Sequence, residues 1–268
     1  MKKRLDLVLY EKGFTESREK ARTTIMAGLV YVDGKLRDKP GEKINEDLKI
    51  EIKGDDIAYV SRGGLKLEKA IEDFRIDVKM KTFLDIGAST GGFTDCLLQR
   101  GAKKVYSIDV GYGQLAWKLR QDPRVVVMER TNFRYLTHED IGEIVDAATI
   151  DVSFISLALI IKNLYNLLNE NGEIIALIKP QFEAGRDKVG KKGVVRDPKT
   201  HIEVINKVIK ELDKEKFFIK NLSYSPIKGP AGNIEFLAYF SKKISEKLED
   251  SEDEIDKVVI EAHEILNK

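Results

Sequence analysis

The chain has 268 residues, of which 42% are hydrophobic and 34% are charged. This length can hold one catalytic domain of roughly 150 to 200 residues and a small second module, and the composition is that of a globular protein. The sequence contains no run of the roughly 18 to 20 uncharged apolar residues that a membrane span needs. Its charged N-terminus also lacks the apolar core of a signal peptide, so we expect a cytoplasmic protein that does not insert into membranes.

A metal site is not expected, because the candidate ligands are few and scattered. Cys96 is the only cysteine and lies in an apolar helical run, which excludes an internal disulfide. The three histidines, His138, His201 and His263, are widely separated in the sequence.

The formal net charge of +1 hides an uneven distribution. Residues 241–268 carry five lysines and nine acidic residues, so the rest of the chain is moderately basic. Such an excess fits either an ordinary solvated surface or a face that binds a polyanion such as RNA. The positions of the basic residues must decide between the two.

Residues 1–58 have the pattern of a compact unit. Amphipathic segments over 5–12 and 17–27, each followed by a glycine, predict two short helices. Alternating runs over 30–35 and 48–52 predict short strands joined by a glycine turn and a Pro-Gly break. The expected result is a pair of helices packed on a small sheet.

Within this unit, the string RLDLVLYEKGFTESREKARTTIMAGLVYVDGK resembles the small RNA-binding module, called S4-type, of a small-subunit ribosomal protein. The resemblance implies that the second helix presents basic residues to folded RNA, where ammonium and guanidinium groups neutralise phosphates. The basic residues of the matching stretch are Arg4, Arg18, Lys20 and Arg22. The alternative for this stretch alone is a solvated helix with Glu16 and Glu19 as partners of the basic residues.

A short linker over 59–64 leads into a larger domain over 65–268, which begins with a helix over 65–74. Strand and helix patterns then alternate, as is typical of an α/β protein with a doubly wound sheet. Apolar runs that predict buried strands lie at 83–86, 105–108, 125–127, 147–150, 174–178 and 236–240. Helical patterns lie at 93–100, 155–168 and 199–212. The tail, residues 241–268, contains an amphipathic helix that we expect to dock on another surface.

A glycine-rich turn follows the first of these strands. Residues 84–93, LDIGASTGGF, run from the strand through the turn into a helix, where glycines allow a ligand to approach and the helix N-terminus offers free amide donors. The dinucleotide fingerprint G-x-G-x-x-G is absent. Asp109 ends the second strand, where an acid can bind two ribose hydroxyls, and Asn132 follows the third, where an amide can bind an adenine edge.

Three strand ends that converge on one nucleoside resemble the class I methyltransferase fold, a Rossmann-like sheet that binds S-adenosylmethionine (SAM). The resemblance implies that Asp85 and Gly87 lie against the methionine part of SAM and that Asp151 faces its methyl group. The residues expected to bind SAM are Asp85, Gly87, Ala88, Ser89, Gly91, Gly92, Phe93, Asp109, Asn132 and Asp151. The alternative is an ordinary turn in which Asp85 is a cap and Asp109 a surface acid.

Four further strings carry a closer resemblance, namely VSRGGLKL, DVSFISL, IKPQFEAGR and GNIEF. Together with LDIGASTGGF, they make the chain similar to the TlyA family of ribosomal RNA methyltransferases, also labelled haemolysins, within the FtsJ-like group. The likeness covers essentially the whole chain, including the N-terminal module. It implies a Lys, Asp, Lys, Glu tetrad around a ribose 2′-hydroxyl, and the matching residues are Lys66, Asp151, Lys179 and Glu235.

The chemistry of this tetrad depends on its two lysines. A free lysine has a pKa of about 10.4 and is a poor base at neutral pH, whereas burial and a second ammonium nearby can lower that pKa. We expect Lys179, at the end of a buried strand, to accept or orient the hydroxyl proton, with Lys66 as its cationic neighbour. Taken singly, Lys66 also fits a surface helix position and Glu235 a charge at a strand edge.

The loop between Phe182 and Pro198 is rich in glycine and in basic residues. We expect it to clamp RNA phosphates beside the site, with a merely solvated loop as the alternative. The RNA-binding residues expected in this loop and just before the first helix of the larger domain are Arg62, Arg186, Lys188, Lys191 and Lys192.

The function expected from the resemblance is transfer of a methyl group from SAM to the ribose 2′-oxygen of a cytidine in ribosomal RNA, in the small subunit, the large subunit or both. The partner is then ribosomal RNA or a ribosomal subunit, and the protein is expected to be a monomer or weak dimer. Two other functions stay open: a ribosome-assembly factor that binds SAM without catalysis, and a membrane-lytic haemolysin.

Overall fold

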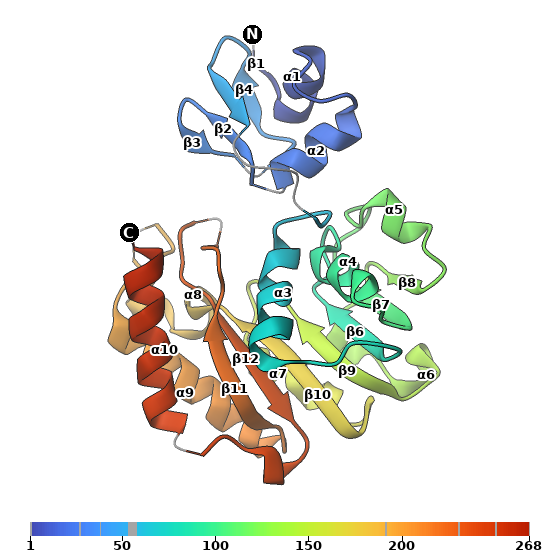
Figure 1. Cartoon of the computed structure of the whole chain (residues 1–268), viewed down its shortest axis with the longest axis vertical. Coiled ribbons are helices and arrows are strands. Elements are labelled where there is room, and N and C mark those ends of the chain that lie inside the picture. Colours follow the sequence, from blue (N-terminus) through green and yellow to red (C-terminus); the bar gives the residue numbers. More distant parts are fainter. Residues whose placement is uncertain are drawn as a thin grey trace.

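The protein has a small N-terminal domain and a larger domain built on a seven-stranded sheet (Figure 1). The structure is a computed structural model, and it describes residues 2–26, 28–37, 39–52, 58–190, 192–229, 231–249 and 251–267, with all side chains except that of Arg186. The small domain lies over the edge of the large sheet at which the parallel strands end (Figure 1).

The N-terminal domain consists of short helices and strands. Its elements are β1 (Lys2–Arg4), α1 (Leu5–Glu11), α2 (Arg18–Met26), β2 (Val30–Val32), β3 (Lys35–Leu36), β4 (Lys43–Asn45) and β5 (Ile50–Ile52). Strands β3, β2 and β5 form an antiparallel sheet, and β1 pairs with β4. The two predicted helices and the strands β2, β3 and β5 are confirmed. The pair β1 and β4 was not predicted, because each strand has only three residues, which are too few for a strand pattern to be recognised.

Local chemistry explains where these elements begin and turn. The Ser17 hydroxyl accepts a hydrogen bond from the backbone N–H of Lys20 at 3.0 Å and so caps α2, as predicted. The β2–β3 hairpin turns at Asp33 and Gly34, which both have a positive φ, the conformation that two-residue hairpin turns favour. The buried core between the helices and strands consists of Leu5, Val8, Leu9, Ala21, Ile25, Val30, Val32, Ile44 and Ile50.

The segment that enters the larger domain packs against it. Tyr59 and Val60 are buried in its core, and the Val60 N–H donates a hydrogen bond to the carboxylate of Asp95 at 2.8 Å. A Cβ on Gly64 would lie 2.3 Å from the Tyr59 ring, so only glycine fits there. Residues 59–61, which the sequence placed in a linker, are therefore packed as part of the larger domain, since burial of their apolar side chains stabilises them there.

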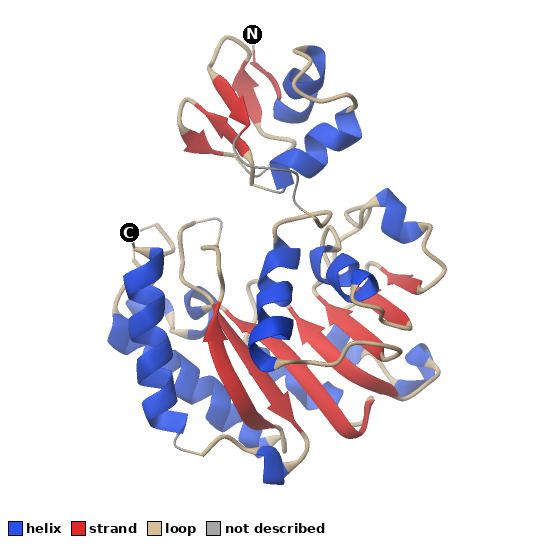
Figure 2. Ribbon diagram, in the orientation of Figure 1, coloured by secondary structure: helices blue, strands red, loops and turns tan. Residues whose placement is uncertain are grey.

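Helices cover both faces of the large sheet (Figure 2). Its strands are β6 (Thr82–Ile86), β7 (Lys104–Ile108), β8 (Val125–Met128), β9 (Val145–Ile150), β10 (Leu168–Ile178), β11 (Phe218–Tyr224) and β12 (Phe236–Ser241). Their order is β11-β12-β10-β9-β6-β7-β8, and β12 runs antiparallel to both of its neighbours, whereas β10, β9, β6, β7 and β8 are mutually parallel. This is the predicted doubly wound sheet. The order reverses between β6 and β9, which is the point at which such sheets bind ligands.

Alternate side chains of the central strands face two separate cores. The helices are α3 (Gly63–Phe74), α4 (Gly92–Gln99), α5 (Trp117–Arg120), α6 (His138–Ile141), α7 (Leu157–Leu164), α8 (Pro180–Glu183), α9 (Pro198–Lys214) and α10 (Ser251–Leu266), with 3-10 turns η1 (Phe133–Tyr135), η2 (Arg186–Lys188) and η3 (Ile244–Glu246). Phe83 of β6 packs in one core with α3 and α4, and its neighbour Leu84 packs in the other with α7, α9 and α10. The tail helix α10 therefore docks on its own domain, against α9 and β11.

Three further details differ from the sequence prediction. Strand β11 was not predicted, because Lys220 and Asn221 interrupt its apolar pattern at the edge of the sheet. The helical pattern over 155–168 ran too far: α7 ends at Leu164, and Leu168 already begins β10, since short apolar runs do not distinguish helix from strand. Ser241, which we counted with the tail, is the last residue of β12.

Candidate active site

The glycine-rich turn joins β6 to α4 at the carboxyl edge of the sheet. Gly87 and Gly91 have φ values of +88° and +93°, a conformation that other residues rarely adopt. A Cβ on Gly87 would lie 2.5 Å from the carbonyl oxygen of Asp151, and a Cβ on Gly91 would lie 2.2 Å from a methyl group of Leu119. The turn therefore needs glycine at both positions, and its bare backbone forms one wall of a cavity.

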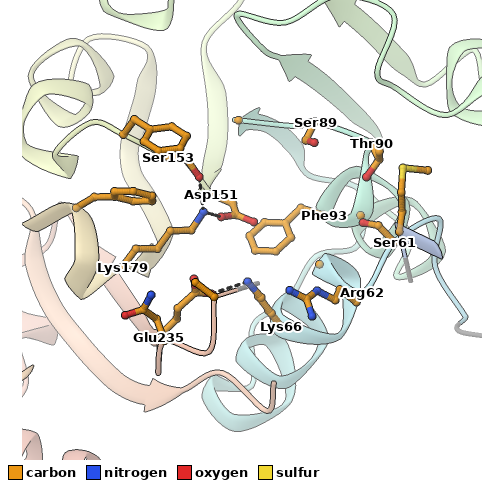
Figure 3. Close-up of a pocket in the computed structure, with 18 of the residues that line it drawn as sticks. Ser61, Arg62, Lys66, Ser89, Thr90, Phe93, Asp151, Ser153, Lys179 and Glu235 are labelled. Carbon is orange, nitrogen blue, oxygen red and sulfur yellow. Dashed lines mark hydrogen bonds and ion pairs between the residues drawn. The ribbon is translucent and has the colours of Figure 1, made fainter. Parts of the chain in front are cut away.

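This cavity has a volume of about 790 Å³ and lies between the turn, the start of α3, the ends of β9 and β10, and the segment before β12 (Figure 3). Its size is within the range of roughly 300 to 1,000 Å³ that is usual for small-molecule sites. Of the residues expected to bind SAM, those that line it are Gly87, Ala88, Ser89, Gly92, Phe93 and Asp151. The N-terminal domain also contributes to the lining, through Met26, Lys39 and Pro40.

Asp85 does not reach the cavity. It is fully buried behind the turn, where its carboxylate accepts hydrogen bonds from the hydroxyls of Thr94 at 2.6 Å and Thr149 at 3.1 Å. Burial raises its pKa to about 6, although these hydrogen bonds act in the opposite direction. The expectation that Asp85 lies against the methionine part of SAM is thus corrected: an enclosed carboxylate cannot contact a ligand, and Asp85 supports the strand below the turn.

Asp109 and Asn132 stand at strand ends, as predicted, and hold the backbone around the turn. One carboxylate oxygen of Asp109 accepts the N–H of Ser89 at 2.8 Å, and the other accepts the N–H of Gly111 at 2.7 Å. The side-chain oxygen of Asn132 accepts the N–H of Arg134 at 3.2 Å and so caps η1. Neither side chain lines the cavity, so their contact with a nucleoside stays a prediction.

The four tetrad side chains meet as two ion pairs (Figure 3). Lys66 of α3 and Glu235, just before β12, lie 2.6 Å apart between Nζ and Oε2, and 6% and 2% of their side chains are exposed. Lys179, directly after β10, and Asp151, directly after β9, lie 2.6 Å apart between Nζ and Oδ1, with 11% and 21% exposed. Lys66 is thus not a surface residue, and Glu235 is not an exposed charge at a strand edge. Both pairs line the cavity.

The Glu235 carboxylate is held on its second oxygen as well. Gln181 donates a hydrogen bond from Nε2 to Oε1 of Glu235 at 3.2 Å. A Cβ on Gly229 would lie 2.5 Å from the same Oε1, so glycine at this position lets the preceding loop close over the carboxylate. The loop thereby fixes Glu235 beside Lys66, which is 169 residues away in the sequence.

Both members of the Lys179–Asp151 pair are stabilised in their charged forms. Burial alone would raise the pKa of Asp151, but the ammonium groups of Lys179 and Lys66 outweigh it and hold the pKa below the usual 3.8. Burial alone would lower the pKa of Lys179, but the carboxylates of Asp151 and Glu235 raise it above the usual 10.5. The expectation of a lowered lysine pKa was therefore wrong, because it counted the second ammonium and omitted the two carboxylates. Lys179 is a charged hydrogen-bond donor at neutral pH.

The basic residues expected on the N-terminal domain lie on or near α2. Arg4 and Arg18 both contact the fully buried carboxylate of Asp6, at 2.9 Å and 3.2 Å, and about half of each arginine side chain is exposed. Lys20 is half-buried and Arg22 is exposed. Asp6 thus holds two guanidinium groups side by side at the surface.

The basic residues expected near the site divide into two groups. Arg62 and Lys192 line the cavity. Lys188 instead forms an ion pair with Glu203 of α9. Lys191 and the side chain of Arg186 lie outside the part of the chain that the structure describes.

Sequence reasoning missed several side chains that line the cavity, among them Ser153, Phe154 and Phe182. The Ser153 hydroxyl accepts a hydrogen bond from Lys179 Nζ at 3.0 Å. Phe154 is 90% exposed, has a φ of +65°, and packs its ring against that of Phe182 at 4.9 Å between centroids. The exposed Phe154 ring, supported by the half-buried Phe182, can stack on an unpaired base. These residues lie in the quoted strings DVSF and PQF, where an aromatic residue that lines a site looks the same as one in a core.

Comparison with known proteins identifies the family of each domain. Residues 59–242 match the FtsJ-like methyltransferase family, and residues 3–50 match the S4 domain. YqxC of Bacillus subtilis, named as a candidate rRNA methyltransferase, is 56% identical and covers 100% of this chain and 96% of its own length. The 16S/23S rRNA (cytidine-2′-O)-methyltransferase TlyA of Mycobacterium tuberculosis is 44% identical over 88% of each chain.

A solved structure from Streptococcus thermophilus, described as a candidate haemolysin, has a TM-score of 0.80 and 48% identity, and the match covers 99% of this chain and 97% of that one. Within the described residues, we find no helix with the length and apolar character needed to cross a membrane. The strand order and the glycine-rich turn are those of a class I methyltransferase. The chain is therefore a member of the FtsJ-like methyltransferase family and, by its identity to TlyA and its N-terminal S4 domain, of the TlyA group within it.

Proposed function

We propose that the protein transfers a methyl group from SAM to a ribose 2′-oxygen in ribosomal RNA, with cytidine as the target nucleotide. The observation that carries the proposal is the placing of two lysine–carboxylate ion pairs in one cavity with a glycine-rich turn. The name of the Mycobacterium tuberculosis relative, which gives a cytidine-2′-O-methyltransferase of 16S and 23S rRNA, supports the choice of substrate.

The turn fits SAM because its glycines allow a tight turn of backbone to line the cavity. We infer that the backbone of Gly87, Ala88, Ser89, Gly92 and Phe93 holds the cofactor, as helix N-termini hold polar ligands. Gly91 shapes the turn. Asp109 and Asn132, at the next two strand ends, are the candidates for binding the ribose and the adenine of SAM. When bound, SAM supplies an electrophilic methyl group on a sulfonium centre.

The tetrad acts on the hydroxyl that receives the methyl group. Lys179 is placed to donate a hydrogen bond to the 2′-oxygen and, with Lys66 as its cationic neighbour, to stabilise negative charge on that oxygen, as preorganised donors do in other active sites. Because Lys179 Nζ carries its proton at neutral pH, it orients the hydroxyl and does not accept its proton. An oxygen that is forming a new bond to carbon becomes strongly acidic, so the weakly basic carboxylate of Asp151 is a sufficient proton acceptor.

The RNA is held by the N-terminal domain and by the basic residues around the cavity. Arg4, Arg18, Lys20 and Arg22 lie on the domain that matches S4, and Arg62 and Lys192 lie where the phosphates that flank the target ribose would pass. This arrangement favours structured ribosomal RNA or a ribosomal subunit as partner, and such a substrate is found in the cytoplasm.

Transfer of tritiated methyl groups from SAM to ribosomal subunits and to naked ribosomal RNA tests the proposal. The wild type should label a cytidine ribose in the small subunit, the large subunit or both, identified by mapping the modified nucleotide. Lys179→Ala should lower the rate by about 10²- to 10³-fold, the usual cost of one preorganised donor, while SAM affinity stays within twofold. Lys214→Ala, an exposed lysine of α9 paired with Glu211, is the matched control. Undiminished methylation by Lys179→Ala would refute the tetrad, and a wild type that binds SAM and subunits without labelling them would make the protein an assembly factor.

A further inference from the structure

Glu183, the last residue of α8, is a buried carboxylate that the tetrad does not include. Both of its oxygens accept hydrogen bonds from the start of α7. The Leu157 N–H donates to Oε1 at 2.8 Å, and the Ser156 hydroxyl donates to Oε2 at 2.8 Å. The carboxylate thus occupies a helix N-terminus, where free N–H groups and the helix dipole favour negative charge.

The hydrogen bonds of Glu183 join the two segments that carry Asp151 and Lys179, the more exposed of the two ion pairs. One segment, 151–156, runs from the end of β9 to α7 and carries Asp151; its first N–H donates to the carbonyl of Ile86 at 2.9 Å. The other segment, 179–183, carries Lys179 at its start and Glu183 at its end. The carbonyl oxygen of Ile86 therefore holds the first residue of segment 151–156, and the carboxylate of Glu183 holds its last residue.

The same two segments also meet at the cavity. Lys179 contacts both Asp151 and Ser153, at 2.6 Å and 3.0 Å, and the rings of Phe154 and Phe182 pack together. These contacts border the cavity, where substrate must enter, whereas the contacts of Glu183 are buried. The hydrogen bonds of Glu183 consequently hold the two segments together on the buried side, through groups that the substrate does not touch.

Capping of α7 does not by itself require Glu183. Ser156 already occupies the N-cap position, and its Oγ accepts the N–H of Ala158 at 3.4 Å. Burying a carboxylate costs free energy, and this burial raises the pKa of Glu183 above its usual 4.5. Lys207 of α9 further anchors the residue by donating a hydrogen bond to its carbonyl oxygen at 2.9 Å. The contacts suit a rigid tie between segments better than an ordinary helix cap.

We propose that Glu183 is a positioning residue for methyl transfer, which holds segment 151–156 against the turn of Lys179 so that the ribose hydroxyl meets Asp151 and Lys179 at a fixed separation. The inference rests on the proposed function for its catalytic meaning. Misplacement of reacting groups by about 1 Å can lower a rate by about 10²-fold, so loss of the tie should act on the chemical step.

The test compares Glu183→Ala, Glu183→Gln and Ser156→Ala in the full-length protein, with Glu173→Ala as a matched control. Glu173 is a partly buried carboxylate in the middle of β10 that does not line the cavity, and it accepts a hydrogen bond from Lys220 at 3.2 Å. Glu183→Ala should lower kcat by about 10- to 100-fold, with KM for ribosomal subunits and Kd for SAM within twofold. Glu183→Gln should recover most of kcat, because the amide oxygen still accepts the Leu157 N–H. Glu173→Ala should lower Tm and leave kcat unchanged.

A wild-type kcat in folded Glu183→Ala, or an equal fall in Glu173→Ala, would overturn the positioning role. Should Glu183→Ala fail to fold, Ser156→Ala removes one of the two hydrogen bonds, and an unchanged kcat in that variant overturns it equally. Hydrogen exchange separates this inference from the proposed function. The amides of residues 152–157 should exchange faster in Glu183→Ala or Ser156→Ala than in wild type and Glu173→Ala, and unchanged protection refutes the tie whether or not the wild type methylates RNA.

Discussion

The two lysine–carboxylate pairs of the site have the same 2.6 Å separation but different surroundings. The Lys66–Glu235 pair is closed from solvent, and Gln181 bonds to its carboxylate as well. The Lys179–Asp151 pair is more open, and its lysine also donates a hydrogen bond to Ser153 at the cavity surface.

This difference suggests that the two ion pairs have different roles, one structural and one in contact with the substrate. A closed pair is costly to break, because removing one partner leaves an uncompensated charge in a buried place. Lys66 and Glu235 therefore hold α3 and the segment before β12 in register. The more open pair exchanges partners at lower cost, so Lys179 and Asp151 are the groups that can turn to a substrate hydroxyl.

Breaking the closed pair should have the largest effect. Lys66→Met leaves the Glu235 carboxylate without its cation, and we expect the free energy of unfolding to fall by about 3 to 5 kcal/mol. Urea denaturation measures it. The double variant Lys66→Met, Glu235→Leu should regain most of this stability because no charge stays buried, while methyl transfer stays lost. A loss below about 1 kcal/mol in the single variant would show that water reaches the pair.

A comparison of Asp85 with Asp151 should show the effect of a cation on the sign of a pH dependence. Asp85 is buried among hydroxyl groups, and its pKa is raised to about 6. The folded protein therefore binds this proton more tightly than the unfolded chain. As the pH rises from about 3.8 to 6, the free energy of unfolding should fall by about 3 kcal/mol. Asp151 has a lowered pKa, so its contribution is present above about pH 3.8 and is lost as the pH falls through its folded value.

Urea unfolding from pH 3 to 8 measures both slopes. Asp85→Asn should remove the fall in stability between about pH 3.8 and 6. Asp151→Asn should differ most from wild type at neutral pH and converge with it in acid. Parallel curves for wild type and Asp85→Asn would mean that the Asp85 carboxyl titrates normally.

The smallest effect is expected at the N-terminal domain, where the buried carboxylate of Asp6 pairs with two half-exposed arginines. Arg18→Ala leaves Arg4 on Asp6, so the loss of stability should stay at or below about 1 kcal/mol. Loss of one phosphate contact should lower the slope of log affinity against log salt concentration by about 1. Filter binding of ribosomal RNA at several salt concentrations measures it, with Lys214→Ala as control. An unchanged slope would place Arg18 outside the RNA interface.

Most of the sheet was predictable because its strands are apolar runs with a local pattern. The exception in the large sheet has a local reason: β11 lies at an edge and carries Lys220 and Asn221. In the N-terminal domain, β1 and β4 were missed because each has only three residues. The turn and the strand ends of Asp151 and Lys179 were visible because of the same local pattern. Phe154 and Glu183 were not, since their exposure and burial result from neighbours on other elements.

The sequence by itself determined the alternation of strands and helices and the glycine positions of the turn, because these depend on neighbours along the chain. Its resemblance to a known family indicated the four residues of the tetrad. Only the tertiary structure decided which lysine faces which carboxylate and how deeply each pair is buried. It also reversed the expected shift in the pKa of Lys179, and it removed Asp85 from the ligand side of the turn. The reason is that electrostatic energy sums over charges within a few ångströms in space, and those around Lys179 come from chain positions as distant as Asp151 and Glu235.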